Sequence, residues 1–170
     1  VDWGFESLRA RLFIRVIIKM VENTNQKMMQ LALDLAKKAF HKEEVPVGAL
    51  IVLNEQIISQ AYNQKETLHD PTAHAEIIAL REACARLNSW HLDDAIMYVT
   101  LEPCPMCAYA IIQARIKRLV FGAYDPKAGA VGSVINIFKK GLFNHDIEVI
   151  GGVLADECGA ILKEFFQNKR

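Results

Sequence analysis

Tyr98-Val-Thr-Leu-Glu-Pro-Cys-Pro-Met-Cys107 decides the fold, because this stretch predicts a buried strand that leads directly into a helix. Residues 95–101 form an apolar run of strand length. Pro105 is of the residue type favoured at the first position of a helix, and this helix is expected to extend to residue 116. Residues 118–123 form the next apolar run, so the order here is strand, helix, strand.

The chain on either side extends this pattern to an α/β domain. Apolar residues recur at helical spacing from Met28 to Phe40, after a polar stretch at residues 22–26. Asn54 and Glu55 separate two short apolar runs, which is typical of a β-hairpin. The remaining expected elements are hairpin strands over 47–53 and 56–62, a helix over 73–86, a Gly-containing loop over 125–133, a fifth strand over 147–153 and a closing helix over 156–167.

Composition limits the classes of function. The chain has 170 residues, of which 52% are hydrophobic, enough for a buried core. Basic and acidic residues number 20 each, so the net charge gives no general attraction to nucleic acid or to an anionic membrane. No apolar run approaches the roughly 20 residues of a membrane span. Residues 113–140 are a local exception, because they contain one acidic residue, Asp125, and six basic residues: Arg115, Lys117, Arg118, Lys127, Lys139 and Lys140. This local positive charge indicates either an RNA-binding patch or a solvated face.

Cys104 and Cys107 form a C-x-x-C pair with several interpretations: a redox dithiol, half of a four-cysteine structural zinc site, or coincidence. Cys84 and Cys158 lie far apart in the sequence, which argues against a second zinc pair. An apolar chain of this length needs no disulfides, so free or metal-bound thiols are expected. A thioredoxin-like redox pair remains an alternative, because the two cysteines follow a strand and open a helix.

His74, at the start of the preceding helix, would complete a ligand set of one imidazole and two thiolates. Three protein ligands leave the fourth position of a tetrahedral zinc ion open, as in catalytic rather than structural sites. Glu76 is two residues from His74 and would point nearly the opposite way on an ideal helix, so it is a poor ligand. It is instead a candidate general acid and base. Taken singly, His74 could be an ordinary structural histidine, and Glu76 could only complement the helix dipole.

Together, His74-x-Glu76 and Pro103-Cys104-x-x-Cys107 resemble the signature of the cytidine/nucleotide deaminase superfamily. The resemblance covers residues 25–170 as a zinc-dependent deaminase domain and leaves residues 1–24 as an N-terminal extension, either a transit peptide or an extension upstream of a start near Met20. The stretches that look like the bacterial tRNA-specific adenosine deaminases are Val45-Pro-Val-Gly-Ala49, His69-Asp-Pro-Thr-Ala-His-Ala-Glu76, Tyr98 to Cys107, Phe121-Gly-Ala-Tyr-Asp125 and Leu154-Ala-Asp-Glu-Cys158.

This resemblance implies a three-layer α/β/α cytidine-deaminase-like fold with a five-stranded mixed sheet. It also implies a cytoplasmic homodimer, with one Zn²⁺ per subunit, that hydrolyses the wobble adenosine of a tRNA anticodon loop to inosine. Glu76 would move the protons, and the backbone N–H groups of Ala75 and Cys104 would help to hold the attacking oxygen. The implied RNA contacts are Asn63 on the flipped nucleotide, Asp125 and Lys127 on the anticodon loop, Asn144 in the pocket, and Phe165, Phe166, Lys169 and Arg170 on a C-terminal helix.

Two other functions stay open. A deaminase of a free base or nucleoside, such as guanine, cytosine or cytidine, would share the metal site and differ in the pocket and the RNA surface. A catalytically silent RNA-binding or zinc-scaffold module would keep the fold without the chemistry.

Overall fold

A five-stranded mixed sheet forms the centre of the protein in a computed structural model that describes residues 3–169, with side chains from residue 9 onward. The strand order is β2-β1-β3-β4-β5. The strands are β1 (Gly48–Leu53), β2 (Gln56–Tyr62), β3 (Ile96–Leu101), β4 (Arg118–Ala123) and β5 (Glu148–Ile150). The helices are α1 (Trp3–His41), α2 (Lys65–Leu68), α3 (Ala75–Leu87), α4 (Pro105–Gln113) and α5 (Ala155–Asn168).

The direction of the strands determines where functional side chains can gather. Strand β1 is antiparallel to both β2 and β3, whereas β3, β4 and β5 are parallel. Leu101 is in register with Ala123, so β3 and β4 end side by side. The segments that follow these two strands therefore begin at the same edge of the sheet, where α/β proteins commonly bind their ligands.

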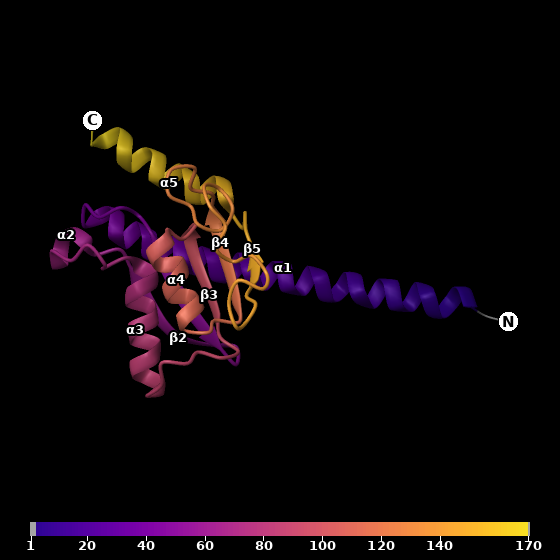
Figure 1. Cartoon of the computed structure of the whole chain (residues 1–170). Coiled ribbons are helices and arrows are strands. Elements are labelled where there is room, and N and C mark those ends of the chain that lie inside the picture. The colour runs from indigo at the N-terminus through magenta and orange to yellow at the C-terminus, as the bar shows by residue number, and fades with distance from the viewer. Residues whose placement is uncertain (1–2, 170) are drawn as a thin grey trace.

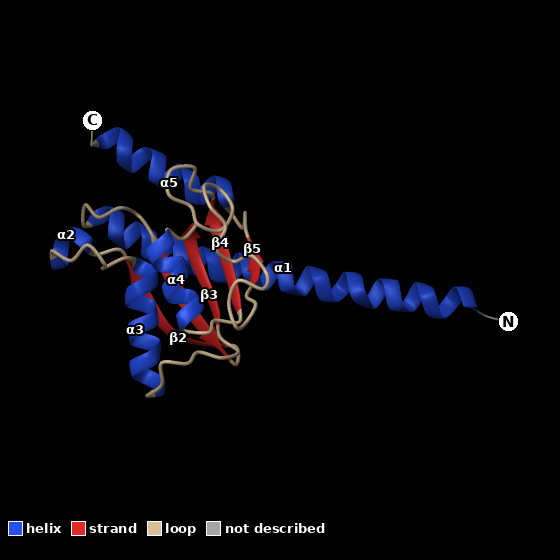
Figure 2. Ribbon diagram, viewed as in Figure 1, coloured by secondary structure: helices blue, strands red, loops and turns tan. Residues whose placement is uncertain are grey.

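Helices cover both faces of the sheet, which confirms the expected three-layer α/β/α fold (Figures 1 and 2). One core packs α3 and α4 against inward-facing strand residues such as Val99 and Phe121. The other core packs α1 and α5 against the opposite face, where Tyr98 and Val120 point. Adjacent strand residues thus contribute to different cores, as the alternation of side chains along a strand requires.

Helix α1 differs from the expectation, because it is one continuous helix from Trp3 to His41 and does not begin after the polar stretch at residues 22–26. That stretch contains no proline or glycine, and the Thr24 hydroxyl donates to the Met20 carbonyl oxygen, 3.0 Å away. Residues 9–24 are exposed throughout, and this half of the helix projects away from the sheet (Figure 1). Within residues 3–169, no helix combines the length and the apolar character needed to cross a membrane.

The other expected elements are present, with small shifts at their ends. The hairpin turn places Asn54 at φ 49° and Glu55 at φ 63°, both in the left-handed region that such tight turns require. Helix α2 is a single turn that the sequence pattern does not predict, and β5 is shorter than the expected residues 147–153.

Candidate active site

The three candidate ligands lie at two helix starts that pack against the same face of the sheet. His74 is the N-cap residue of α3 and Cys104 is the N-cap residue of α4, both with extended backbone. Pro105 follows as the first helical residue, and Cys107 lies in the first turn of α4. The Nδ1 atom of His74 is 3.7 Å from the Cys104 sulfur and 3.4 Å from the Cys107 sulfur.

These distances fit a tetrahedral zinc ion. Zn–S bonds of about 2.3 Å and Zn–N bonds of about 2.0–2.1 Å place sulfur and nitrogen roughly 3.6 Å apart at the tetrahedral angle. The three donor atoms all lie within 4.8 Å of one another, and no other group of three or more His, Cys, Asp or Glu side chains in residues 9–169 is arranged to hold a metal. None of the four cysteines forms a disulfide.

The two thiols of the site differ in acidity. A hydrogen bond from Cys107 lowers the pKa of Cys104 to about 4, even though burial opposes this, and His74 adds to the effect. The same contact with Cys104, together with burial, raises the pKa of Cys107. Metals bind cysteine as thiolate, so a metal held by both sulfurs would displace any proton that they share.

Glu76 lies in the first turn of α3 and is almost completely buried. Burial raises the pKa of this carboxyl, and attraction to His74 offsets only part of the increase. A carboxyl with a raised pKa suits a group that must both accept and donate a proton near neutral pH. Glu76, His74 and Cys104 line one pocket of about 190 Å³ at the carboxyl ends of β3 and β4.

Two of the residues expected to contact RNA line the same pocket. Asn63 follows β2 and is buried, and Asp125 follows β4 and is partly buried. Lys127 is exposed two residues further on, and its backbone N–H donates to Asp125 Oδ1 over 2.9 Å. Asn63 and Asp125, which are far apart in the sequence, thus lie in one pocket with Glu76.

The remaining expected contacts lie outside this pocket. Asn144 is exposed in the loop before β5 and lines two other depressions. Phe165 is buried on α5 with its ring 5.8 Å from that of Phe40, whereas Phe166 is exposed. Lys169 is described, but Arg170 lies outside the described residues.

Two buried carboxylates were not predicted as site residues: Glu102, which lines the pocket, and Glu44, which lies behind Asn63. Glu102 accepts hydrogen bonds from the backbone N–H groups of Asp125, Val131 and Ser133 at 2.9–3.0 Å, and from the Ser133 hydroxyl. Glu44 accepts hydrogen bonds from Asn63 and from the first turn of α2. The sequence signal for either residue is weak: Glu102 follows the apolar run that ends at Leu101, whereas Glu44 follows two charged residues, Lys42 and Glu43.

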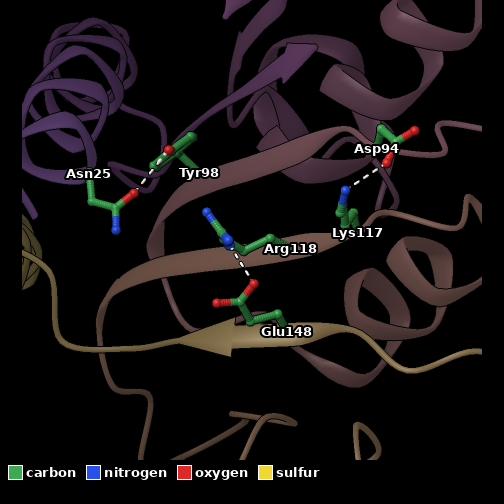
Figure 3. Close-up of polar contacts among 6 residues, drawn as sticks. All are labelled: Asn25, Asp94, Tyr98, Lys117, Arg118 and Glu148. Atoms are coloured by element: carbon green, nitrogen blue, oxygen red, sulfur yellow. Dashed lines mark hydrogen bonds and ion pairs between the residues drawn. The ribbon is translucent and has the colours of Figure 1, made fainter. Parts of the chain in front are cut away.

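The six cations of residues 113–140 do not all lie together. Lys117 pairs with Asp94 and Arg118 with Glu148, each over 2.7 Å, at the amino end of β4 (Figure 3). Lys127 instead follows the carboxyl end of this strand. The six residues of β4 extend over about 20 Å, so cations that are close in the sequence lie at opposite ends of the sheet.

Known proteins resemble this chain in sequence and in fold. Residues 23–170 match the family model of the MafB19-like deaminases. The tRNA-specific adenosine deaminase of Bacillus subtilis (strain 168) is 49% identical over 142 residues, which are 84% of this chain and 88% of that protein. A solved tRNA:A34 deaminase, studied for A-to-I editing at the wobble position, has a TM-score of 0.77 at 46% identity, over 80% of this chain and 99% of that one. A guanine deaminase from Nitrosomonas europaea has a TM-score of 0.71 at 25% identity, over 82% and 83% of the two chains.

Proposed function

The chain belongs to the family of tRNA-specific adenosine deaminases, and we propose that it hydrolyses the wobble adenosine of a tRNA anticodon loop to inosine. The observation that carries this proposal is one pocket lined by Glu76, two of the candidate metal ligands, and the expected nucleotide contacts Asn63 and Asp125. A loop adenosine is already unpaired, so it enters such a pocket at a lower free-energy cost than a base in a duplex.

We propose that His74 Nδ1 and the sulfurs of Cys104 and Cys107 hold one Zn²⁺ per subunit. The donor types and their spacing support zinc, since one imidazole and two thiolates leave a fourth position open. When bound, the ion would lower the pKa of a water molecule to about 7 and so supply a nucleophile at neutral pH.

Glu76 would carry the protons of the reaction. Its carboxylate takes a proton from the attacking water and delivers it to N1 of the adenine ring, and a second proton reaches the departing amine by the same route. The bond between C6 and the amine then breaks, so that adenosine and water become inosine and ammonia. The backbone N–H groups of Ala75 and Cys104, at the starts of α3 and α4, would help to hold the attacking oxygen.

The remaining proposed contacts hold the RNA. Asn63 hydrogen-bonds the flipped nucleotide, while Asp125 and Lys127 meet the sugar and phosphates of the loop. Asn144, Phe165 and Phe166 are further proposed RNA contacts on the family resemblance alone, since they lie outside the pocket of one subunit.

We further propose that the enzyme is a homodimer that acts on tRNA in the cytoplasm. Trp90, Tyr109 and Leu142 support a dimer, because these large apolar side chains are exposed and line one depression beside α4. Apolar surface gathered in this way commonly marks a contact with another protein.

Deamination of a synthetic anticodon stem-loop with adenosine at the wobble position tests the proposed function. We expect inosine at this position on sequencing, and no product from a stem-loop whose adenosine is one position away. Free adenosine, cytidine and guanine serve as further substrates in parallel. Deamination of a free nucleoside or base as fast as the stem-loop would overturn the tRNA assignment in favour of the free-substrate alternative.

Metal analysis separates the zinc site from a redox dithiol. Protein purified without chelator is expected to hold one zinc per chain, and Cys104→Ser is expected to lose it. Zinc-free protein with a reversible disulfide between Cys104 and Cys107 would instead support the redox interpretation.

A further inference from the structure

We infer that Glu44 is a positioning residue, which fixes the side-chain amide of Asn63 for recognition of the substrate. The inference rests on the proposed function, because Asn63 contacts a nucleotide only under that proposal. Glu44 itself lies behind Asn63 and does not line the pocket.

Glu44 lies in the turn between α1 and β1 and is fully buried. One carboxylate oxygen accepts from Asn63 Nδ2 over 3.1 Å and from the backbone N–H of Glu66 over 3.2 Å. The other oxygen accepts from the backbone N–H of Thr67 over 2.7 Å. The carboxylate therefore joins a pocket-lining side chain to the first turn of α2.

The chemistry of these contacts sets the orientation of the Asn63 amide. An ionised carboxylate can only accept hydrogen bonds, so the amide nitrogen of Asn63 must face Glu44. Turning the amide over would place its carbonyl oxygen against the carboxylate and leave two acceptors facing each other. The backbone of Asn63 is also held, since its N–H donates to the Val47 carbonyl oxygen over 3.0 Å. The pocket therefore meets one fixed arrangement of donor and acceptor at Asn63.

The same turn of the chain also meets the proposed metal site and the C-terminal helix. Gln64, which follows Asn63, donates its backbone N–H to the carbonyl oxygen of Ala73, next to His74. At the other side, Lys169 Nζ donates to the carbonyl oxygen of Glu43 over 3.1 Å. Glu44 is thus placed between the proposed tRNA-contacting helix and the nucleotide pocket.

A merely structural role for Glu44 makes a different prediction. A buried carboxylate that only stabilises the fold would, when replaced, lower the stability of the protein and leave KM and kcat of the folded enzyme unchanged. A positioning role predicts a change in KM that depends on Asn63. A double-mutant cycle measures this dependence directly.

The experiment compares the wild type, Glu44→Gln, Asn63→Ala and the double variant by steady-state kinetics on the anticodon stem-loop. Glutamine keeps the shape of glutamate but can donate a hydrogen bond, so Asn63 loses its single preferred orientation. Each single variant is expected to raise KM about tenfold, the factor that one hydrogen bond provides. The double variant is expected to match Asn63→Ala alone, because Glu44 acts through this side chain. Independent effects that multiply, or an unchanged KM in either single variant, would overturn the inference.

Tyr98→Phe is the matched control. Its hydroxyl donates to Asn25 Oδ1 over 3.0 Å, which is another buried hydrogen bond that reaches the α1 region, but on the face of the sheet away from α3 and α4 (Figure 3). This variant is expected to lower the thermal midpoint and to leave KM unchanged.

Glu44→Asp covers the case in which Glu44→Gln fails to fold. Aspartate keeps the charge and the two acceptor oxygens but is one methylene shorter, so KM should rise by a smaller factor than in the glutamine variant. An unchanged KM in Glu44→Asp would also count against positioning. Wild-type protein that makes no inosine would refute the proposed function, whereas active wild type with unaffected Glu44 variants would refute only the role of Glu44.

Discussion

The buried carboxylates on the floor and at the walls of the pocket have pKa values shifted in opposite directions. Glu76 on the floor, Glu44 behind one wall and Glu102 on another are only 4%, 0% and 2% exposed. Burial raises the pKa of Glu76. Burial acts in the same direction on the other two, but hydrogen bonds, mostly from backbone N–H groups, outweigh it and hold both pKa values below the ordinary 4.5.

The difference follows from the number of donors that face each carboxylate. Glu102 receives four hydrogen bonds and Glu44 receives three, so their charges are stabilised and fixed. A carboxylate held in this way is a poor proton carrier and a good anchor for loops. At Glu76 burial outweighs the groups that stabilise the charge, so its pKa is shifted upward. Under the proposed mechanism, the pocket thus separates a group for chemistry from groups for positioning.

Glu76→Gln tests the floor and has the largest expected effect. Loss of the general acid and base should lower kcat on the stem-loop by about 10²- to 10⁴-fold. Zinc content and affinity for the stem-loop should be retained, because Glu76 is neither a proposed zinc ligand nor a proposed RNA contact. The measurements are single-turnover inosine formation, metal analysis and RNA binding. Unchanged activity would remove Glu76 from the mechanism.

Glu102→Gln tests one wall. Glutamine keeps one acceptor oxygen and places an N–H₂ donor where the other oxygen was, so at least one of the backbone N–H groups of Asp125, Val131 and Ser133 loses its acceptor. Each buried group left unpaired costs about 1–3 kcal/mol. We therefore expect a loss of about 3 kcal/mol in the free energy of unfolding, measured by urea denaturation. Glu76→Gln, denatured in parallel, should lose much less. Equal losses in the two variants would contradict the contrast between floor and walls.

The same contrast explains which parts of the site the sequence could predict. The sequence predicts four candidate site residues from residue type and local spacing alone: His74, Glu76, Cys104 and Cys107. The strands and helices around them follow from short-range apolar patterns. Glu102 could not be assigned a role, since its donors are backbone groups up to 31 residues away that only the pairing of β3 with β4 brings near.

Two expectations failed for related reasons. The polar residues 22–26 were expected to precede a helix, yet polar side chains do not end a helix when neither proline nor glycine is present. The cations at Lys117 and Arg118 were grouped with Lys127 because they are close in the sequence, but a strand places its two ends far apart.

Acid denaturation tests Glu44, which lies behind the wall at Asn63. Its folded pKa lies below the ordinary value of 4.5, so its stabilising contribution is complete above this pH and is lost as the pH falls through the folded pKa. We expect the free energy of unfolding of the wild type to be about 2 kcal/mol higher than that of Glu44→Gln at pH 7, because hydrogen bonds to a charged group usually contribute this much. The gap should narrow steadily below pH 4.5. Both proteins are measured at each pH, so that shared contributions cancel, and a gap that stays constant into acid would show that the charge of Glu44 is unimportant.

Glu148→Gln sharpens the comparison from outside the pocket and has the smallest expected effect. Glu148 forms an ion pair in which its carboxylate lies 2.7 Å from Arg118 Nε (Figure 3). Unlike the carboxylates at the pocket, its side chain is 53% exposed. Water can replace the lost partner, so the free energy of unfolding should change by less than about 0.5 kcal/mol, and the rate of inosine formation should not change. A loss of stability as large as that of Glu102→Gln would mean that an exposed ion pair stabilises the fold as much as the hydrogen bonds to a buried carboxylate do. A negligible loss would indicate that the larger loss of stability at Glu44 and Glu102 comes from burial together with the backbone N–H groups that donate to each carboxylate.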